Sequence, residues 1–113
     1  MVDVNLIVKD ILSKIDGVKI TFYHPKVFNS LPVISYYELT TSTGFSYDNS
    51  EQAQMSNVVI DIWGNSGAEC SMFAVEVDKH MQVNGWKRNF SRDLPPENDI
   101  YHKNMRFSKQ IYF

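Results

Sequence analysis

Three histidines and one cysteine are the side chains of this chain with the widest chemical use. His24, His80 and His102 lie far apart in the sequence, and none has a second histidine four residues away, as helical metal sites require. Cys70 falls on the apolar stripe of a predicted helix, where small buried cysteines are common, and thiol catalysis requires a base beside it. This pattern favours structural roles for all four residues.

Carboxylates and glycines also fall short of the patterns that bind ions or phosphate. Asp48 and Glu51 lie close together, but a calcium loop requires several carboxylates at regular offsets. The five glycines stand isolated, so they form no glycine-rich phosphate loop. A single cysteine excludes an internal disulfide and a cysteine-based zinc cluster. We therefore expect no catalytic residue, no metal and no cofactor.

The last third of the chain interleaves aromatic and basic residues. Six of the eleven lysines and arginines follow Gly85. The net charge of the whole chain is −2, which gives general binding to nucleic acid or to a membrane surface no electrostatic support. The pattern points to a surface for another macromolecule rather than to a catalytic pocket.

Length and composition limit the classes of protein to which this chain can belong. A chain of 113 residues fits one domain, residues 1–113, and its fraction of hydrophobic residues, 43%, is enough for a packed core. The first residues lack the pattern of a signal peptide, and no apolar run reaches the roughly 18 residues that span a bilayer. We expect a protein that is made in the cytoplasm and has no contact with membranes.

Hydrophobic periodicity predicts two helices, at residues 4–15 and 68–83. Asp3 is a good N-cap for the first, and Ser66 with Glu69 forms a capping box for the second. Alternating patterns predict five strands, at residues 18–23, 33–40, 56–63, 86–92 and 100–107, with 93–99 as the connection of the closing hairpin.

The order helix, strand, strand, strand, helix, strand, strand predicts an α+β fold. We expect a mostly antiparallel mixed sheet of about five strands with two helices packed on it. The strand connections look too short for parallel crossovers, except the one through the second helix. Thr41 to Gln54 is expected to be a long polar loop, and long loops are often functional.

Charged residues inside the predicted strands are unusual. Asp61 shares a strand face with Trp63, and Arg88 is expected to share one with Trp86 and Phe90. We expect both tryptophans to be largely core, and Phe90 to pack with Trp86.

Three explanations remain open for these charges. In the first, the charged side chains lie on a solvent-exposed face, and aromatic neighbours cover their aliphatic parts. In the second, another subunit covers that face. In the third, Asp61 or Glu38 pairs internally with Arg88 or Arg106, held by geometry more than by net energy.

Four segments, in this order, resemble the small tail-completion proteins of long-tailed bacteriophages. They are similar above all to the tail-to-head joining proteins, or tail terminators, of siphophages and related prophages. The segments are Leu31–Glu38 with Tyr47–Glu51, Val59–Trp63, Gly85–Arg88 leading to Asp93-Leu94, and Ile100–Phe107. The chain departs from the family at Pro95-Pro96, which stiffen the turn.

The resemblance implies a structural virion protein without catalysis. Such proteins have an α+β fold and form a ring, generally a hexamer, that caps the tail tube and presents a surface to the head connector or stopper protein. The implied partners are further copies of the chain, the tail tube protein, the connector and, in passing, DNA in the lumen. The candidate interface residues are Phe45, Tyr47, Asp48, Glu51, Arg88, Arg92, Asp93, His102 and Arg106.

Two other functions stay open from the residues alone. The first is a small bacterial ligand-binding protein or enzyme that uses His102, Arg88 and Asp61 as a polar cluster. A deep pocket around these residues would favour it. The second is a bacterial regulatory module that binds another protein through the same sheet.

Overall fold

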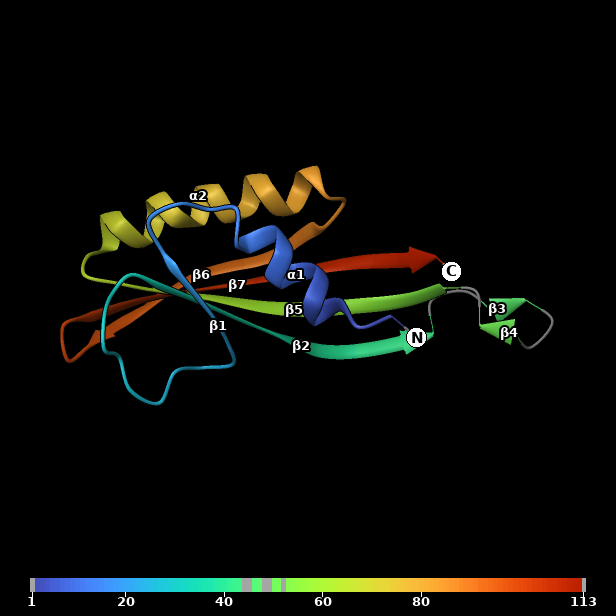
Figure 1. Ribbon diagram of the computed structural model, residues 1–113, viewed down its shortest axis with the longest axis horizontal. Coiled ribbons are helices and arrows are strands. Elements are labelled where there is room, and N and C mark those ends of the chain that lie inside the picture. Colours follow the sequence, from blue (N-terminus) through green and yellow to red (C-terminus); the bar gives the residue numbers. More distant parts are fainter. Residues whose placement is uncertain (1, 44–45, 48–49, 52, 113) are drawn as a thin grey trace.

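A five-stranded mixed sheet carries both helices on one of its faces (Figure 1). The computed structural model describes residues 2–43, 46–47, 50–51 and 53–112. The spatial order of the strands is β1-β2-β5-β7-β6. The elements are α1 Val4–Leu12, β1 Lys19–Phe22, β2 Val33–Thr43, β3 Ser46–Tyr47, β4 Ser50–Glu51, β5 Ala53–Gly64, α2 Gly67–Val83, β6 Lys87–Glu97 and β7 Ile100–Tyr112. The predicted α+β fold is confirmed.

Both helices begin at the predicted caps. The Asp3 carboxylate accepts a hydrogen bond from the amide of Asn5 at 3.0 Å, and the Ser66 hydroxyl accepts one from the amide of Glu69 at 3.1 Å. Helix α1 ends at Leu12, earlier than the predicted Ile15. The side chain of Ile15 is nevertheless buried in the core, which explains why it continued the apolar spacing.

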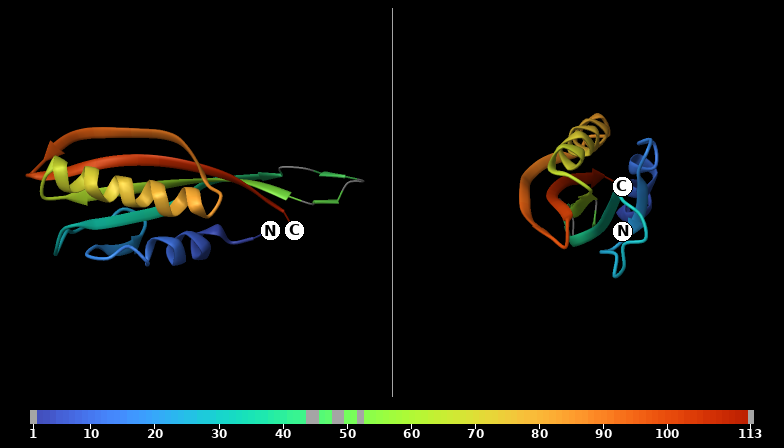
Figure 2. Two further views of the ribbon diagram at one scale, coloured as in Figure 1. Left: turned by 90° about the horizontal axis from the view of Figure 1, so that it is seen from above. Right: turned by 90° about the vertical axis from the view of Figure 1, so that its left-hand side faces the viewer.

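The core lies between the helices and the sheet face that they cover. This helix face of the sheet carries Ile60, Ile62, Met105 and Phe107, all of them at most 1% exposed. Apolar stripes of both helices pack onto it, and their buried residues are Val4, Val8, Ile11, Leu12, Cys70, Phe73, Ala74, Val77 and Met81. The far face is the opposite side of the sheet, which has no helix on it (Figure 2).

Strand β1 pairs with β2 in parallel, from Lys19 opposite Val33 to Phe22 opposite Tyr36. The prediction that only the connection through the second helix could serve parallel strands was therefore wrong. The segment 23–32 returns the chain to the starting end of β1 without a helix. Its own side chains fasten it to the far face, as described below, so the connection needs no helix to hold it.

The closing hairpin has a much shorter turn than predicted. Only Asn98 and Asp99 lie between the strands, and both have positive φ, 52° and 62°, which is typical of a two-residue hairpin turn. The expected connection at residues 93–99 is mostly strand. Pro95 and Pro96 fit there because β6 is an edge strand, and the pairing shifts register between Leu94 and Glu97.

A bulge at Asn89 divides β6 between the two faces of the sheet. Arg88 lies opposite Phe107, whereas Phe90 lies opposite Arg106, the next residue back along β7. Arg88 is therefore on the helix face, and Phe90 is on the far face with its side chain 39% exposed. The expectation that Phe90 packs with the core was wrong, because alternation predicts faces only for a strand without a bulge.

Strands β2 and β5 continue beyond the helices as a projecting arm, which we define as the described residues between 40 and 57. Their pairing runs out to Thr43 opposite Gln54, and β3 pairs with β4 at the tip. Much of the predicted loop Thr41 to Gln54 is thus strand. The radius of gyration, 15.0 Å, exceeds the roughly 13 Å of a compact chain of this length. Figure 2 shows the arm extending past both helices.

A buried glutamine holds the amino-terminal segment to the base of the arm. The Gln54 side-chain amide donates to the Val2 carbonyl at 3.0 Å and to the Ser56 hydroxyl at 2.9 Å. Its carbonyl oxygen accepts from the Val2 amide at 2.7 Å. Because Gln54 is fully buried, these bonds replace those that water would otherwise make.

Candidate functional site

A buried aspartate with three hydrogen-bond partners lies at the centre of the far face. Asp61 of β5 is 0% exposed. Its Oδ1 accepts from His102 Nε2 at 2.6 Å and from Asn104 Nδ2 at 2.8 Å, both on β7. Its Oδ2 accepts from His24 Nε2 at 2.7 Å, which comes from the segment 23–32. The sheet and the connecting segment thus meet at one carboxylate.

The surroundings of Asp61 favour its ionised form. Burial raises the pKa of the carboxyl, but the hydrogen bonds from His102 and Asn104, together with the electrostatic effects of His102 and His24, lower it by more than burial raises it. The pKa therefore lies below its ordinary value, and Asp61 is a carboxylate at neutral pH. Since a carboxylate only accepts, each histidine must present an Nε2–H to it.

Aromatic side chains surround this cluster. The Trp63 ring stacks on the His102 imidazole, with 3.6 Å between the ring centroids and 14° between the planes. The Trp63 indole N–H donates to the Ser35 hydroxyl at 3.0 Å. On the segment 23–32, Phe28 packs against Trp63 at 5.0 Å. The cluster therefore fastens the 23–32 segment to the sheet through both hydrogen bonds and stacked rings.

None of the three explanations for the strand charges describes Asp61 in full. Asp61 is neither solvent-exposed nor bound to an arginine; its partners are two histidines and an asparagine. The third explanation is wrong for Asp61 and Arg88, because Arg88 lies opposite Phe107 on the helix face. There Arg88 pairs with Asp78 of α2 at 3.3 Å.

An aromatic ring between two arginines lies elsewhere on the far face. The guanidinium of Arg106 is 5.5 Å from the centroid of the Phe90 ring, and that of Arg92 is 6.0 Å away. Neither arginine makes an ion pair with any residue that the structure describes. We call Phe90, Arg92 and Arg106 the Phe90 patch.

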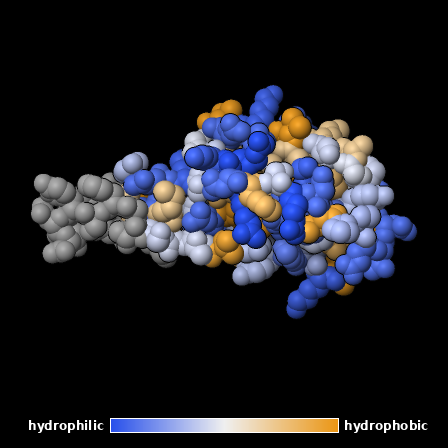
Figure 3. Space-filling view, turned by 180° about the vertical axis from the view of Figure 1, so that it is seen from behind, coloured by the Kyte–Doolittle hydropathy of each residue, from blue (hydrophilic) through white to orange (hydrophobic). Residues whose placement is uncertain are grey.

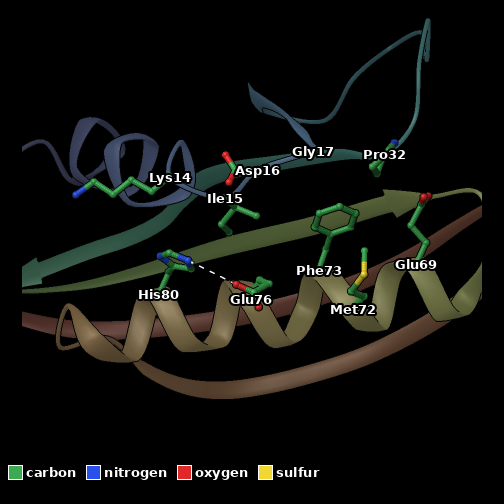
Figure 4. Close-up of a pocket in the computed structure, with 10 residues that line it drawn as sticks. All are labelled: Lys14, Ile15, Asp16, Gly17, Pro32, Glu69, Met72, Phe73, Glu76 and His80. Carbon is green, nitrogen blue, oxygen red and sulfur yellow. Dashed lines mark ion pairs between the residues drawn. The ribbon is translucent and has the colours of Figure 1, made fainter.

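A groove of about 620 Å³ separates the turn after α1 from α2 (Figure 4). Ile15, Met72 and Phe73 supply its apolar surface, and carboxylates lie around it. We call it the acidic groove. Its lining residues are Lys14, Ile15, Asp16, Gly17, Pro32, Glu69, Met72, Phe73, Glu76 and His80.

The structure brings only some of the predicted interface residues together. His102 belongs to the Asp61 cluster, and Arg92 and Arg106 flank Phe90. Arg88 lies on the opposite face, and Asp93 pairs with Lys103 at 3.1 Å.

The other predicted interface residues lie in or near the arm. Tyr47 is in β3 and Glu51 is in β4. Phe45 and Asp48 lie outside the described residues.

Sequence reasoning missed His24, Asn104 and the whole acidic groove. Asn104 could have been found, because alternation places it beside His102 on the same face of β7. His24 gave no such signal: it follows a strand, precedes Pro25, and is 37 residues from Asp61. The groove gave no signal either, because its lining comes from the turn after α1, Pro32 and one side of α2, which are far apart in the sequence.

The cluster of His102, Arg88 and Asp61 that a ligand-binding protein or enzyme would use does not form. His102 lines two cavities, of about 320 and 260 Å³, but neither is lined by Asp61 or Arg88. Among the described residues, no three His, Cys, Asp or Glu side chains are grouped to hold a metal ion. The hydrogen-bonding atoms of Asp61 are already used within the protein.

Cys70 should be almost inert in the native protein. It is 2% exposed, and burial, with the nearby charges of Glu69 and Asp93, raises the pKa of its thiol to about 11. At pH 8 its thiolate fraction is about 200-fold smaller than that of a free cysteine. Alkylation by iodoacetamide, followed by mass spectrometry, should therefore be at least about 200-fold slower than in guanidinium chloride. Similar rates in the two conditions would contradict this prediction.

No protein-family model matches the chain, and the search of curated proteins gives no significant match.

Proposed function

We propose that this chain is the subunit of a ring that caps a phage tail tube and joins it to the head. The observation that carries the proposal is the projecting arm, residues 40–57. It adds to the resemblance of four ordered segments to the tail-completion proteins. The ring is proposed to contain six copies, to contact the tail tube protein on one side and the head connector on the other, and to let DNA pass.

The arm supports assembly because it extends beyond its own core. Residues at its base, Ala53, Gln54 and Ser56, are buried, but β3 and β4 form a separate two-stranded sheet at the tip. A two-stranded ribbon alone is at best marginally stable in water. Contact with a neighbouring subunit would stabilise this ribbon.

The two faces of the sheet also suit a ring. A head-to-tail ring requires two different surfaces on each subunit, since every contact joins one surface to the other. The helix side carries the acidic groove, and the far face carries the Phe90 patch. The Asp61 cluster holds the 23–32 segment on the far face, which supports a structural rather than a catalytic role.

A virion location follows from this proposal and is part of it. None of the helices in the described residues has the length and hydrophobicity needed to cross a bilayer. We propose that the chain is made in the cytoplasm of the bacterial host and is then built into the tail-to-head joint.

Electron microscopy and light scattering test the proposal directly. Purified protein, alone and mixed with tail tubes, should give rings of about six copies of the 13.1 kDa chain or rings at tube ends. A chain that stays monomeric at every concentration, and that leaves tail tubes uncapped, would rule the proposal out.

Removal of residues 46–51, a segment that includes β3 and β4, should abolish rings but leave folding almost unchanged. The two strands pair with each other in a sheet separate from the five-stranded one, so the melting temperature should move by no more than about 2 °C. Light scattering gives the assembly state and circular dichroism the melting temperature. A variant with glycine and serine at the same six positions separates the effect of length from that of sequence. Normal rings from both variants would remove the arm tip from the interface.

A further inference from the structure

We propose that the Phe90 patch of one copy docks into the acidic groove of the next copy. This inference rests on the proposed ring and names the two surfaces that would meet in it.

The Phe90 patch has the chemistry of a knob that another protein surface would accept. Phe90 is 39% exposed, although it is a large apolar side chain. The guanidiniums of Arg92 and Arg106 lie beside its ring and have no carboxylate partner among the described residues. Aromatic residues and arginine are the types most enriched in the energetically important parts of interfaces.

The acidic groove offers the complementary features. Met72 is 57% exposed and contributes, with Phe73, an apolar surface for an aromatic ring. Three carboxylates, from Asp16, Glu69 and Glu76, line the same groove. Its volume, about 620 Å³, lies in the range of pockets that hold ligands larger than one aromatic side chain.

The cations of the groove do not cancel these carboxylates. His80 lies 3.6 Å from Glu76 and is charged only when it is protonated. Lys14 is the other basic residue of the lining. Asp16 and Glu69 make no ion pair within the described part of the chain, although Glu69 accepts two hydrogen bonds from Asn65. Two arginines entering the groove would balance its charge.

The two surfaces lie on opposite sides of the sheet. The groove is formed by α2 and the turn after α1, on the helix side (Figure 4). The Phe90 patch lies on the far face, because Phe90 and Arg92 are opposite Arg106 and Asn104 of β7. A patch that fits a groove on the other side of an identical molecule gives a heterologous contact, which closes into a ring when the rotation permits.

Duplex DNA is the alternative binding partner for the Phe90 patch. The observations favour a second copy of this chain instead. The view of the molecule from behind is mostly hydrophilic, with small hydrophobic spots that are separated from one another (Figure 3). The chain has a net charge of −2, which repels DNA at a distance. The same molecule also carries a groove with the opposite charge and a matching apolar surface.

Charge reversal on each side provides the test. The patch variant is Arg92→Glu with Arg106→Glu, and the groove variant is Asp16→Lys with Glu76→Lys. Each variant alone should form no rings in light scattering, with self-association at least about 100-fold weaker than that of the wild type. An equal mixture of the two should associate again, because each reversed patch then meets a reversed groove.

Controls separate this result from misfolding and from failure of the ring proposal. Lys9→Glu with Lys26→Glu reverses two exposed charges outside both surfaces and should assemble like the wild type. Circular dichroism should show the same melting temperature for all variants within about 3 °C. Rings from the wild type and from both reversed variants would overturn the docking inference alone. No association of the wild type under any condition would overturn the ring itself.

Fluorescence polarisation with a labelled DNA duplex tests the competing occupant. We expect the wild type and the patch variant to bind the duplex equally weakly. Loss of duplex binding in the patch variant, with normal rings, would show that the patch serves nucleic acid and would overturn the docking inference.

Discussion

Substitution of Asp61 by asparagine should lower the free energy of unfolding by about 3 kcal/mol at pH 7. Asp61 is fully buried and accepts hydrogen bonds from His24, His102 and Asn104. Asparagine keeps the size of the side chain but replaces one accepting oxygen with an N–H₂ group. The N–H₂ group cannot accept, so one of the three donors loses its acceptor. Urea unfolding followed by fluorescence measures the difference.

The loss of stability caused by Asp61→Asn should also depend on pH. The pKa of Asp61 determines the direction of this dependence. The folded state lowers that pKa below the ordinary value, so folding favours the ionised form. The resulting stability is fully present above the pKa of the unfolded chain, about 3.9, and is lost as the pH falls through the folded value. The difference between wild type and Asp61→Asn should therefore shrink as the pH falls below about 3.9.

A variant that removes only one hydrogen-bond donor to Asp61 provides the comparison for this loss of stability. His24→Ala removes one of the three partners, and its side chain is 49% exposed, so the cost should be only about 1 kcal/mol. An Asp61→Asn variant as stable as wild type at pH 7, or a difference that stays constant down to pH 2, would show that the carboxylate contributes no charge-dependent stability.

Replacement of Trp86 by alanine should cost about 3–5 kcal/mol, because it removes one of the largest side chains of the core. Trp86 is 2% exposed and packs in the same cluster as Met81 and Phe107. The alanine side chain would leave a cavity that the helix and the sheet only partly fill. Denaturant unfolding of the variant measures the loss.

Two further substitutions make this test sharper. The indole N–H of Trp86 has no hydrogen-bond partner among the described residues, so Trp86→Phe should cost clearly less than Trp86→Ala. Phe90→Ala, at an exposed ring on the other side of the bulge, should cost less than about 1 kcal/mol. Equal losses for Trp86→Ala and Phe90→Ala would contradict the division of β6 between the two faces.

The sequence predicted the features that depend on neighbouring residues. The caps at Asp3 and Ser66 follow from side chains that bond amides two or three positions away. The separation of Ile60 and Ile62 from Asp61 follows from the two-residue period of a strand. The α+β class then follows from the order of these elements.

The features that the sequence did not reveal depend on contacts between distant residues. The bond between His24 and Asp61 joins positions with no local pattern in common, and only the tertiary fold brings them together. The bulge at Asn89 reversed the expected face of Phe90, because one extra residue changes alternation without changing composition. The prediction for Trp63 was also partly wrong, since it covers His102 on the far face and is not in the core.

The irregular shape of β6 has a consequence for solubility. An open edge strand can recruit strands from other copies and grow into fibres without limit. The bulge at Asn89, the register shift near Leu94, and Pro95 with Pro96 interrupt the row of amides and carbonyls that such growth requires. Copies of the chain can then meet through side chains instead of adding strand to strand.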